Sequence, residues 1–574
     1  MSASQKNRLA GTGRLSPARP VNFSFDGVAM QGLEGDTLAS ALIANDVHLA
    51  GRSFKYHRPR GILSAGVEEP NAIVQVKRDT AAHRAECARH GGRDYDGFAA
   101  ESQNRWPSLA FDVGAVNDLA SPFIPAGFYY KTFMWPQKAW AKLYEPNIRV
   151  AAGLGKAPTQ ADPDAYANRF AHCDVLVIGA GAAGLAAALA AAEAGADVMI
   201  VDENPAAGGA LKFETGATID GQAGWDWATA TAAKLAAMGN VRLLTRTTAF
   251  GYMAQNMVCL VERITEHLAR PDSDTPRERV WQVRAKRVVI ATGAIERHMV
   301  FAENDRPGIM LASAARTYLN HYGVAVGKNV GVFTACDSAY HAAIDLAKAG
   351  VTVAAIVDWR DAPKGEAIDA ARALGIEIIS GAGVVSTGGR LRVSSMVVRA
   401  KAGGSNQIIP VDALLMSAGW TPSVHMYSQS RGRVVWDAAT ERFLPGDYPQ
   451  DAVSVGACKG TLTLAETIDE ALAAGERHAR ETGAKAKAPK LKTATGESFA
   501  GSHAGATLGA AEGEPVKAFV DFQNDVTAKD IGLAVREGMH SIEHVKRYTT
   551  TGMATDQGKL SNMNALAIAA LRRF

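Results

Sequence analysis

One stretch constrains the fold more than any other: VLVIGAGAAGLAAALAAAEAGADVMIVDE, residues 175–203. A short apolar run, typical of a buried parallel strand, leads into a G-x-G-x-x-G pattern, an Ala-rich helical segment follows, and DVMIVDE predicts a second strand. In such a β-α-β unit the first glycine allows a tight turn, the second lets a pyrophosphate approach the backbone, and the third lets helix and strand pack closely. The positive end of the helix dipole faces the phosphates. The stretch therefore predicts a dinucleotide site on Gly179, Gly181 and Gly184.

Asp202 and Glu203 end the second predicted strand, where an acidic side chain binds ribose hydroxyls. Tight packing of an Ala/Gly-rich helix could by itself explain the glycines. The strand, the helix, the second strand and the acidic residue that a dinucleotide site requires are, however, all present. Residues 329–358 repeat the strand–turn–helix–strand pattern without its glycines. Asp337 in that repeat would repel a pyrophosphate, so we interpret the repeat as a retained fold without a nucleotide.

Composition narrows the class of protein. The 574 residues suggest roughly three to four domains. A formal net charge of +3 gives no electrostatic signal for nucleic acid. No apolar run is long enough to span a membrane, and the N-terminus lacks the apolar core of a secretory signal. Five scattered cysteines without a CxxC pair argue against a disulfide framework or a cysteine-built metal site, and predict reduced thiols in the cytoplasm.

The patterns also divide the chain. VNFSFDGVAM predicts a strand pair turning at Asp26–Gly27, and a helical and a strand-like segment follow it. The long connection that carries Trp106, Trp135 and Trp140 is expected to pack over something. We predict an α/β protein with an N-terminal arm (1–20), a ferredoxin-like β-grasp domain (21–104), an aromatic-rich connection (105–170), a two-dinucleotide-binding, Rossmann-like domain (171–480, its degenerate second unit at about 325–410), a linker (481–513) and a small helical domain (514–574).

The stretch GRSFKYHRPRGILSAGVEEPNAIVQV, residues 51–76, resembles the small ferredoxin-like domain of amine and opine dehydrogenase complexes. Members with an iron–sulfur cluster place cysteines around such a stretch, whereas this one has none and carries Ser53 and Ser64. A hydroxyl does not replace a cluster thiolate, so we expect no cluster. Its basic residues could bind an anion, and they suit a solvated or interface-facing loop equally well; they are Arg52, Lys55, His57, Arg58 and Arg60.

In the last domain, residues 530–538 and 541–546 predict two short helices. The loop that follows them, RYTTTGMATDQGK, offers many hydrogen-bond donors and few acceptors. That balance suits a phosphate. On composition alone a surface loop with capping threonines is favoured, because Ser/Thr turns are common. The candidate donors are Arg547, Thr549, Thr550, Thr551, Thr555 and Lys559.

The run NPAAGG after Glu203 and the later ATG at residues 291–293 resemble the two-dinucleotide-binding flavoprotein superfamily. The resemblance implies an ADP moiety with Ala183 at the pyrophosphate, Asp202, Glu203 and Asn204 at the ribose, and the backbone of Ala249 at the adenine; it also assigns Gly209, Ala210, Thr292, Gly293, Gly456, Ala457 and Leu462 to the cofactor. Members that hold FAD carry an aspartate where Ala457 stands. A methyl group cannot accept that hydrogen bond, a loss of roughly 1.5–3 kcal/mol, which favours NAD over FAD.

The order of motifs along the chain is more specific than any one of them. A cysteine-free ferredoxin-like domain precedes GAGAAG…VDENPAAGG, ATGAIERHMVFAENDRPGIM, TACDSAY, GACKGTLTLAE and KRYTTTGMATDQGK. This order closely resembles the alpha subunits of the heterotetrameric sarcosine oxidase family, from about residue 14 to the end.

The resemblance implies a complex that oxidises sarcosine to glycine and a one-carbon unit while oxygen is reduced to hydrogen peroxide. It implies NAD on this chain, FAD on the beta subunit, FMN at the alpha–beta interface, and gamma and delta subunits as further partners. The loop with Arg547, Thr549, Thr550, Thr551 and Lys559 becomes a candidate for the alpha contribution around the FMN phosphate.

Two alternatives stay open at this stage. A subunit of an FAD-dependent opine or amine dehydrogenase would carry Gly-Asp at 456–457 and cysteines in its first or last domain, which this chain lacks. A non-catalytic assembly subunit could hold NAD as a structural ligand. No residue pattern suggests a catalytic group or a metal site, so none is assigned. Alpha subunits of the family continue into a folate-binding, aminomethyltransferase-like domain, whereas this sequence ends at LRRF, so no folate site is assigned.

Overall fold

The computed structural model of the chain describes residues 5–78, 82–87, 96–119, 121, 124–127, 135–151, 161–162, 164–268, 272, 274–485, 491, 494–499, 501 and 517–572, with the side chains of 77–78, 82–87 and 151 outside that description. The chain forms two compact units. Unit 1 comprises Met1–Asp162, Glu296–Gly419 and Ala504–Phe574, and unit 2 comprises Pro163–Ile295 and Trp420–His503.

Unit 2 is built on a sheet whose centre is parallel. Strand β8 (Tyr166–Ile178) pairs in parallel with β9 (Val198–Val201) on one side and with β15 (Glu278–Ile290) on the other. The remaining strands extend this sheet; they are β12 (Val241–Leu244), β13 (Thr247–Tyr252), β14 (Met257–Arg263) and β28 (Ala452–Ser454). The predicted β-α-β unit is confirmed, because β8 and β9 are joined through helix α4 (Ala182–Glu193).

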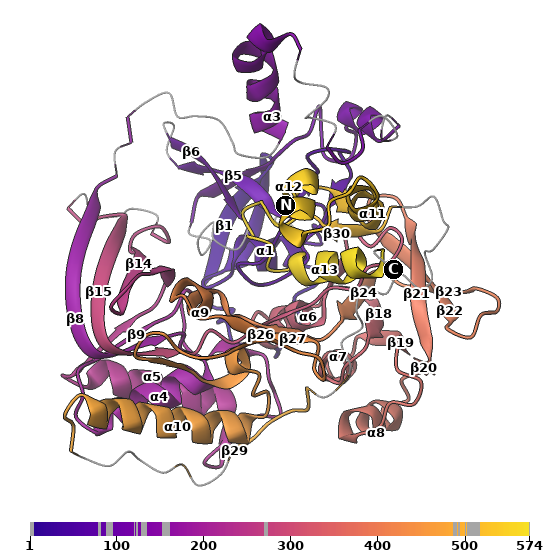
Figure 1. Cartoon of the computed structure of the whole chain (residues 1–574). Coiled ribbons are helices and arrows are strands. Elements are labelled where there is room, and N and C mark those ends of the chain that lie inside the picture. Colours follow the sequence, from indigo (N-terminus) through magenta and orange to yellow (C-terminus); the bar gives the residue numbers. More distant parts are fainter. Residues whose placement is uncertain are drawn as a thin grey trace. The chain divides into compact units, whose positions relative to one another are not determined.

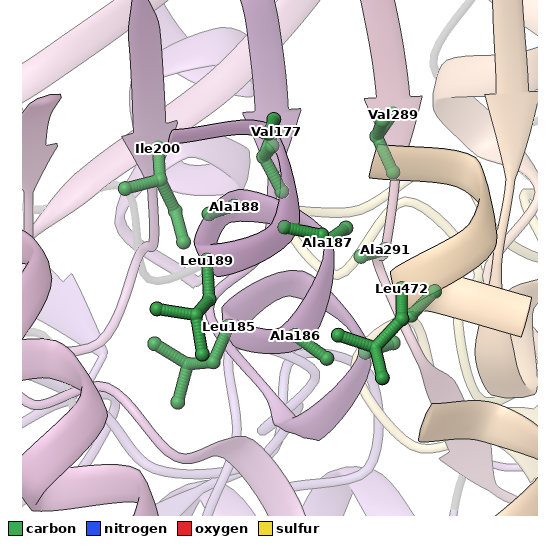
Figure 2. Packing of buried hydrophobic residues seen from close by; sticks show 14 of the residues in the cluster. Val177, Leu185, Ala186, Ala187, Ala188, Leu189, Ile200, Val289, Ala291 and Leu472 are labelled. Atoms are coloured by element: carbon green, nitrogen blue, oxygen red, sulfur yellow. The ribbon is translucent and has the colours of Figure 1, made fainter. Parts of the chain in front are cut away.

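Helix α4 lies against the sheet of unit 2 (Figure 1). It is buried almost all round, as an Ala-rich helix between a sheet and other helices must be. Figure 2 shows Leu185 and Leu189 of α4 packed with Val177 and Ile200 of the sheet, and Leu472 of α10 (Leu464–Glu481) packed with the same cluster. A side chain at Gly475 would overlap the backbone of Ala187, so α10 crosses α4 at a distance that only glycine permits. Unit 2 also contains η5 (Gly209–Lys212), β10 (Thr218–Ile219), β11 (Gln222–Ala223), α5 (Gly224–Ala237), α9 (His425–Gln429), β26 (Val434–Asp437), β27 (Arg442–Pro445), η6 (Gly456–Lys459) and β29 (Ala494–Thr495).

The middle of unit 1 is the predicted second β-α-β repeat. Strands β18 (Asn329–Thr334) and β19 (Thr352–Asp358) are parallel and are joined by α7 (Ser338–Lys348). They belong to a five-stranded sheet in the order β17-β24-β18-β19-β20. The other elements of this part are β17 (Ile309–Leu311), α6 (Ala312–Asn320), α8 (Glu366–Ala373), β20 (Ile378–Ser380), β21 (Ala382–Gly389), β22 (Val393–Ala400), β23 (Gln407–Pro410) and β24 (Ala413–Ser417).

The N-terminal part of unit 1 is a β-grasp sheet in the order β2-β1-β7-β5-β6. The predicted hairpin is confirmed, since β1 (Pro20–Phe25) and β2 (Val28–Leu33) are antiparallel around Asp26–Gly27. Helix α1 (Leu38–Ala44) starts with a capping box between Thr37 and Ser40. The sheet and its loops are completed by β3 (Gly51–Arg52), β4 (Pro59–Arg60), β5 (Ile73–Arg78), β6 (Ala82–Cys87) and β7 (Phe98–Ser102). The described part of the predicted arm packs here too, since Arg8 forms an ion pair with buried Asp36 at 2.5 Å.

The C-terminal part of unit 1 contains one helix more than the sequence indicated. The hairpin β30 (Phe519–Asp521) and β31 (Val526–Thr527) precedes α11 (Ala528–Arg536) and α12 (Ile542–Thr549), which were the two expected helices. Residues 562–571 form α13 (Asn562–Leu571), whose apolar side chains pack against α11. Its short Ala-rich segment lacks the polar face that marks an amphipathic helix, which is why the pattern missed it.

The connection after β7 contains η1 (Val113–Asp118), η3 (Gln137–Ala139), η4 (Trp140–Tyr144) and α3 (Glu145–Ala151). Most of the predicted linker lies outside the described residues. In the part of the chain that the structure describes, we find no helix that is both long and apolar enough to cross a bilayer.

Candidate functional site

The predicted glycine turn of unit 2 is a tight backbone cradle. A side chain on Gly179 would overlap the carbonyl of Ala291, and one on Gly184 would overlap the carbonyl of Gly179. The Gly208–Gly209 turn lies against Gly181, with the Gly208 N–H donating to the Ala180 carbonyl at 2.7 Å. A Cβ on Gly209 would stand 2.8 Å from the Gly181 Cα. Glycine at these positions is therefore required by backbone contacts, as the spacing predicted.

Helix α4 begins at Ala182 with Gly181 as its N-cap, and no side chain caps its N-terminus. The first N–H groups of a helix have no partner within the helix. With the positive end of the helix dipole they form a site for an anion. The backbone beside Gly181 thus meets the requirement of a pyrophosphate for N–H donors and close approach.

Asp202 is buried and holds this turn together. Its Oδ2 accepts from the N–H of Ala180 at 2.7 Å, and its Oδ1 accepts from the backbone N–H and side-chain amide of Asn204, both at 2.7 Å. The carboxylate therefore links the end of β9 to the glycine turn. Arg263 donates to the carbonyl of Glu203 at 2.8 Å and fixes the next residue of the same segment.

The late turn predicted from GACKG also lies at the start of α4. A Cβ on Gly456 would stand 3.1 Å from the Cβ of Ala183, and Gly456 has a positive φ of 72°. Glu470 of α10 accepts the N–H of Gly456 and forms an ion pair with Lys459 at 3.0 Å. The structure thus brings the 456–457 turn to the cradle.

The other predicted contacts of unit 2 frame the same region. Thr292 and Gly293 follow β15 beside Gly179, and the Thr292 hydroxyl donates to the carbonyl of Ser423 at 2.8 Å. Ala249 lies in β13, next to a bulge, and β13 is tied to Asp202 through the N–H of Thr247 at 2.7 Å. The two remaining positions are Ala210 in η5 and Leu462 after η6.

In the second β-α-β unit, side chains pair with one another at the position where a nucleotide would bind. Arg360 forms ion pairs with Asp337, in the turn that should carry glycines, at 2.7 Å and with Asp358, at the end of β19, at 2.8 Å. Asp358 also accepts from the Tyr340 hydroxyl at 2.6 Å. The acid that would bind a ribose is thus bound to side chains of its own unit, which supports the interpretation as a fold without a nucleotide.

The C-terminal loop belongs to unit 1 and is stabilised by hydrogen bonds of its own buried threonines. Thr549 and Thr551 are buried and their hydroxyls lie 2.8 Å apart, while the Thr549 hydroxyl donates to the carbonyl of Val545. Arg547 is exposed and Lys559 half-buried. The two threonines therefore shape the loop, and the two cations and Thr550 border it.

Two buried carboxylates anchor that loop. Asp521 accepts the N–H of Gly552 at 2.7 Å, and Asp556 accepts the N–H of Gly558 at 3.2 Å. Burial raises the pKa of both carboxyls, that of Asp556 to about 6, and the charge of Asp521 adds to the shift at Asp556. This acidic pair explains why the TDQG sequence folds back onto the hairpin of β30 and β31.

The basic residues of the ferredoxin-like loop are buried, not solvated. Arg58 binds Asp525 at 2.6 Å, and Asp525 also accepts the N–H of Lys55 at 2.8 Å. Arg60 donates to the Gln523 carbonyl at 2.6 Å, and Arg52 donates to the Leu109 carbonyl at 2.9 Å. Arg58 thus binds a carboxylate of the same chain, while Arg52 and Arg60 bind backbone carbonyls, so these residues face a contact within the chain and not solvent.

Glu69 occupies the centre of the neighbouring turn. Its two oxygens accept four backbone N–H groups at 2.6–3.1 Å, those of Leu63, Ser64, Asn71 and Ala72. Burial raises its pKa to about 7, against the opposing effect of these hydrogen bonds. A side-chain carboxylate thus organises the stretch that in cluster-bearing relatives of this domain carries cysteines.

The ERHMVFAEND motif clamps the C-terminal part to the middle of unit 1. Asn304 donates to the carbonyl of Phe519 at 2.9 Å and accepts its N–H at 2.8 Å. His298 lies 3.1 Å from both the Val520 carbonyl and the Asn564 amide. Burial lowers the pKa of His298 to about 4.

Acidification is expected to weaken this clamp. The unfolded chain binds a proton at His298 near pH 6.5 and the folded chain only near pH 4. The contribution of neutral His298 to stability is therefore fully present above pH 6.5 and is lost as the pH falls toward 4. Between pH 6.5 and 5 the free energy of unfolding of unit 1 should drop by about 2 kcal/mol relative to His298→Gln. Denaturant titrations of both proteins measure this difference, and exposed His540→Gln should keep the wild-type slope.

Sequence reasoning missed several residues that organise these sites. Glu470, Arg263 and Arg360 contribute through contacts with distant segments. Asp525 and Asn564 do the same for the C-terminal part. No local pattern marks them, because their partners lie 14 to 467 positions away in the sequence.

Three family descriptions match parts of the chain. Residues 18–104 match "2Fe-2S iron-sulfur cluster binding domain", residues 173–442 match "Pyridine nucleotide-disulphide oxidoreductase", and residues 515–573 match "Sarcosine oxidase A3 domain". The first two, with the mixed α/β architecture, confirm the predicted fold class. Residues 18–104 contain a single cysteine, Cys87, and a [2Fe–2S] cluster needs four protein ligands. The residues present do not fit that cluster.

A solved structure and two curated proteins resemble the chain over most of its length. L-proline dehydrogenase from P. horikoshii matches with a TM-score of 0.66, 19% identity and coverage of 99% of this chain and 94% of that chain, which shows a shared fold. The sarcosine oxidase subunit alpha of Rhizobium meliloti (strain 1021) is 51% identical over 99% of this chain and 56% of its own length. That of Corynebacterium sp. (strain P-1) is 37% identical over 97% of this chain and 54% of its own length.

The chain thus spans about half the length of the curated relatives it matches. The likeness runs through the β-grasp part, both β-α-β units and the C-terminal part, where residues 515–573 match the sarcosine oxidase A3 domain. The chain is thus a relative of sarcosine oxidase alpha subunits over about half of their length.

Proposed function

We propose that this chain is the NAD-binding alpha subunit of a heterotetrameric sarcosine oxidase, which oxidatively demethylates sarcosine to glycine while oxygen is reduced to hydrogen peroxide. The observation that carries the proposal is 51% identity to a sarcosine oxidase alpha subunit over 99% of the chain. FAD on the beta subunit and FMN at the alpha–beta interface would supply the redox chemistry. This chain would hold a dinucleotide and one side of the FMN site, and no catalytic residue on it is proposed.

The cradle of unit 2 fits the ADP half of NAD. The glycine turn admits a pyrophosphate, and the uncapped N-terminus of α4 provides N–H donors. Asp202 holds the turn with both carboxylate oxygens, so we propose Glu203 and Asn204 as the ribose contacts and Asp202 as the residue that positions them. The turn at Gly456 meets Ala183, where Ala457 offers no carboxylate for a flavin end.

The nucleotide released on denaturation tests this proposal. The chain purified alone should release NAD and no flavin, as measured by absorbance and mass spectrometry. Stoichiometric FAD would contradict the argument from Ala457 and favour a dehydrogenase-type subunit. An empty site in the isolated chain and in the assembled complex would contradict NAD binding altogether and favour a pure assembly role.

Replacing Gly181 with alanine should remove the nucleotide without unfolding the chain. Gly181 has a φ of −73°, which alanine adopts freely, and its Cβ would stand 3.8 Å from the nearest backbone atom, Gly209 Cα. The same methyl group would occupy the space through which the pyrophosphate approaches. We expect NAD affinity to fall at least about tenfold, equivalent to about 1.4 kcal/mol, with the melting temperature of the nucleotide-free protein unchanged.

Gly239→Ala is the matched control for this change. Gly239 lies in the same unit, and a Cβ there meets nothing within 4 Å. It should retain full NAD content. Unchanged affinity in Gly181→Ala would show that the nucleotide does not lie on the glycine turn.

We propose that Arg547 and Lys559 are the cations of this chain that bind the FMN phosphate, with Thr550 as a further donor. The buried Thr549 and Thr551 would hold the loop in shape. Each charge-assisted hydrogen bond to a phosphate is worth about 1.5–3 kcal/mol. Arg547→Ala with Lys559→Ala should therefore lower the FMN content and oxidase turnover of the assembled complex at least about tenfold. Arg536→Ala, an exposed cation one helix away, should change neither. Normal FMN content in the double variant would contradict this placement.

The proposed partners are the beta, gamma and delta subunits, with sarcosine as substrate of the complex and the cytoplasm as its compartment. An opine or amine dehydrogenase subunit is the less supported alternative. It would need cluster cysteines or a flavin anchor, and the sequence has neither at the matching positions.

A further inference from the structure

Residues 106–119 of unit 1 present their large apolar side chains to the outside. The exposed fractions are 68% for Trp106, 67% for Phe111, 43% for Val113, 61% for Val116 and 81% for Leu119. We call these five side chains the apolar strip. The sequence led us to expect that this connection packs over something, and within the described residues of this chain these side chains do not.

The backbone beneath the strip is firmly anchored. Buried Asp112 accepts the N–H of Trp106 at 2.9 Å and binds the His57 ring at 2.8 Å. Arg52 donates to the Leu109 carbonyl, and Lys517 forms an ion pair with Asp118. Asp112 thus faces inward and fixes the backbone at Trp106, while the large apolar side chains of the segment face outward.

The geometry makes the strip continuous. The Val113 N–H donates to the carbonyl of Trp106 at 2.8 Å, which sets these two residues side by side. Val113 and Val116 lie three residues apart in η1, a 3₁₀ helix, and Leu119 follows at the same spacing as its C-cap residue. Residues three apart stand over one another on a 3₁₀ helix, because it has three residues per turn.

The exposed apolar area is comparable to the largest apolar patch of a typical monomer. Whole aromatic side chains present about 150–250 Å², so the five side chains leave on the order of 500 Å² of apolar surface exposed. The largest apolar patch of a typical monomer is about 300–600 Å² and is usually functional. One side of a standard protein–protein interface buries about 800 Å². The strip alone would provide more than half of one such side.

The charges near the strip favour a protein over a membrane. Residues 106–119 contain two aspartates and no lysine or arginine. Apolar faces that bind membranes are flanked by basic residues that meet anionic headgroups. Asp112 and Asp118 are already paired within the chain. A charge-poor apolar protein surface is the complement of this face.

Described residues that follow the strip in the sequence contact the C-terminal part that carries the loop proposed for FMN. After Leu119 the chain reaches Ala126, whose N–H donates to Asp530 of α11 at 2.9 Å. Gly127 lies so close to the Tyr548 ring of α12 that a side chain there would overlap it. Tyr548 stands between Arg547 and Thr549. A partner that covers the loop proposed for FMN would therefore also lie near the apolar strip.

We propose that the apolar strip is a docking surface for the subunit that completes the FMN site. This inference rests on the proposed function, since that function names the partner. The partner would present an apolar face of low charge to Trp106, Val116 and Leu119, and would exclude water from the edge of the FMN loop.

Co-purification of the full chain with its beta, gamma and delta subunits tests the inference. We compare wild type with Val116→Glu/Leu119→Glu. Two carboxylates buried in an apolar interface should weaken assembly at least about 100-fold, measured as the dissociation constant by analytical ultracentrifugation. The melting temperature of the chain alone should stay unchanged, since both side chains are exposed. Ile408→Glu, in an equally exposed position of β23, should assemble like wild type.

The outcomes separate the two proposals. Wild-type assembly together with normal assembly of the double variant overturns the docking surface and leaves the proposed function intact. Equal loss of assembly in Ile408→Glu also overturns it, because the effect would be unspecific. If the wild-type chain alone forms a dimer that the double variant lacks, or binds phosphatidylserine vesicles through the strip, the occupant is a second copy or a lipid and the inference fails. If wild type does not assemble with the other subunits, the proposed function fails, and the inference with it.

Discussion

Replacing Arg58 with alanine is expected to destabilise unit 1 by about 3–5 kcal/mol, the usual cost of leaving a buried charge without its partner. Arg58 binds Asp525 at 2.6 Å, and its guanidinium lies 4.5 Å from the centre of the Phe519 ring. Burial acts to raise the pKa of Asp525, but Arg58 and Arg60 outweigh it and hold that pKa below its usual value. Without Arg58 the carboxylate stays buried between the β-grasp part and the C-terminal part.

The measurement is the denaturant midpoint of unit 1, together with the rate at which protease cuts the C-terminal part. Arg19→Ala is the matched control, because Arg19 pairs with Glu34 at 2.9 Å on the exposed surface, where such a pair is worth well under about 1 kcal/mol. Adding Asp525→Asn to Arg58→Ala should recover part of the loss, since the asparagine oxygen still accepts the N–H of Lys55. Stability equal to wild type in Arg58→Ala would show that the Arg58–Asp525 pair does not hold the β-grasp part and the C-terminal part together.

Replacing Glu69 with glutamine is expected to cost about 2–4 kcal/mol, although the two side chains have the same shape. Both Glu69 oxygens accept pairs of backbone N–H groups. The amide nitrogen of glutamine is itself a donor, so it would face two N–H groups and leave them unpaired inside the protein, each at about 1–2 kcal/mol. Thermal and denaturant unfolding measure the loss.

Glu68→Gln provides the comparison for this change. It makes the same chemical change one residue earlier, at a half-buried side chain, and should shift stability by less than about 0.5 kcal/mol. Equal stability of the Glu69 and Glu68 variants would show that the four hydrogen bonds do not depend on a carboxylate.

The sequence predicted those parts of the fold whose cause is local. The glycine turn, the strands on either side of it and helix α4 follow from apolar runs and from glycines at fixed spacing. The turn at Gly456 was placed by the family resemblance, and the structure brings it against Ala183. Which nucleotide lies there stays a prediction, as do the FMN contacts.

The parts that could not be predicted depend on contacts between distant segments. The basic residues around Arg58 allowed three interpretations until Asp525, 467 positions away, was seen beside them. Helix α13 buries one stripe of residues against α11, but its other positions are mostly apolar too, so no polar face marks it in the sequence. Asp202 looked like a ribose ligand in its segment alone, and only the structure shows both its oxygens bound to the turn.

The carboxylate of Glu69 has a consequence for how the protein matures. A domain organised by a metal centre stays incomplete until the metal arrives, because ligand binding and folding share one free energy. Here the group that organises the turn is the Glu69 side chain, which is present as soon as the chain is synthesised. The β-grasp part should therefore reach its final form without iron uptake, cluster carriers or protection from oxygen, and a cell starved of iron should still complete it.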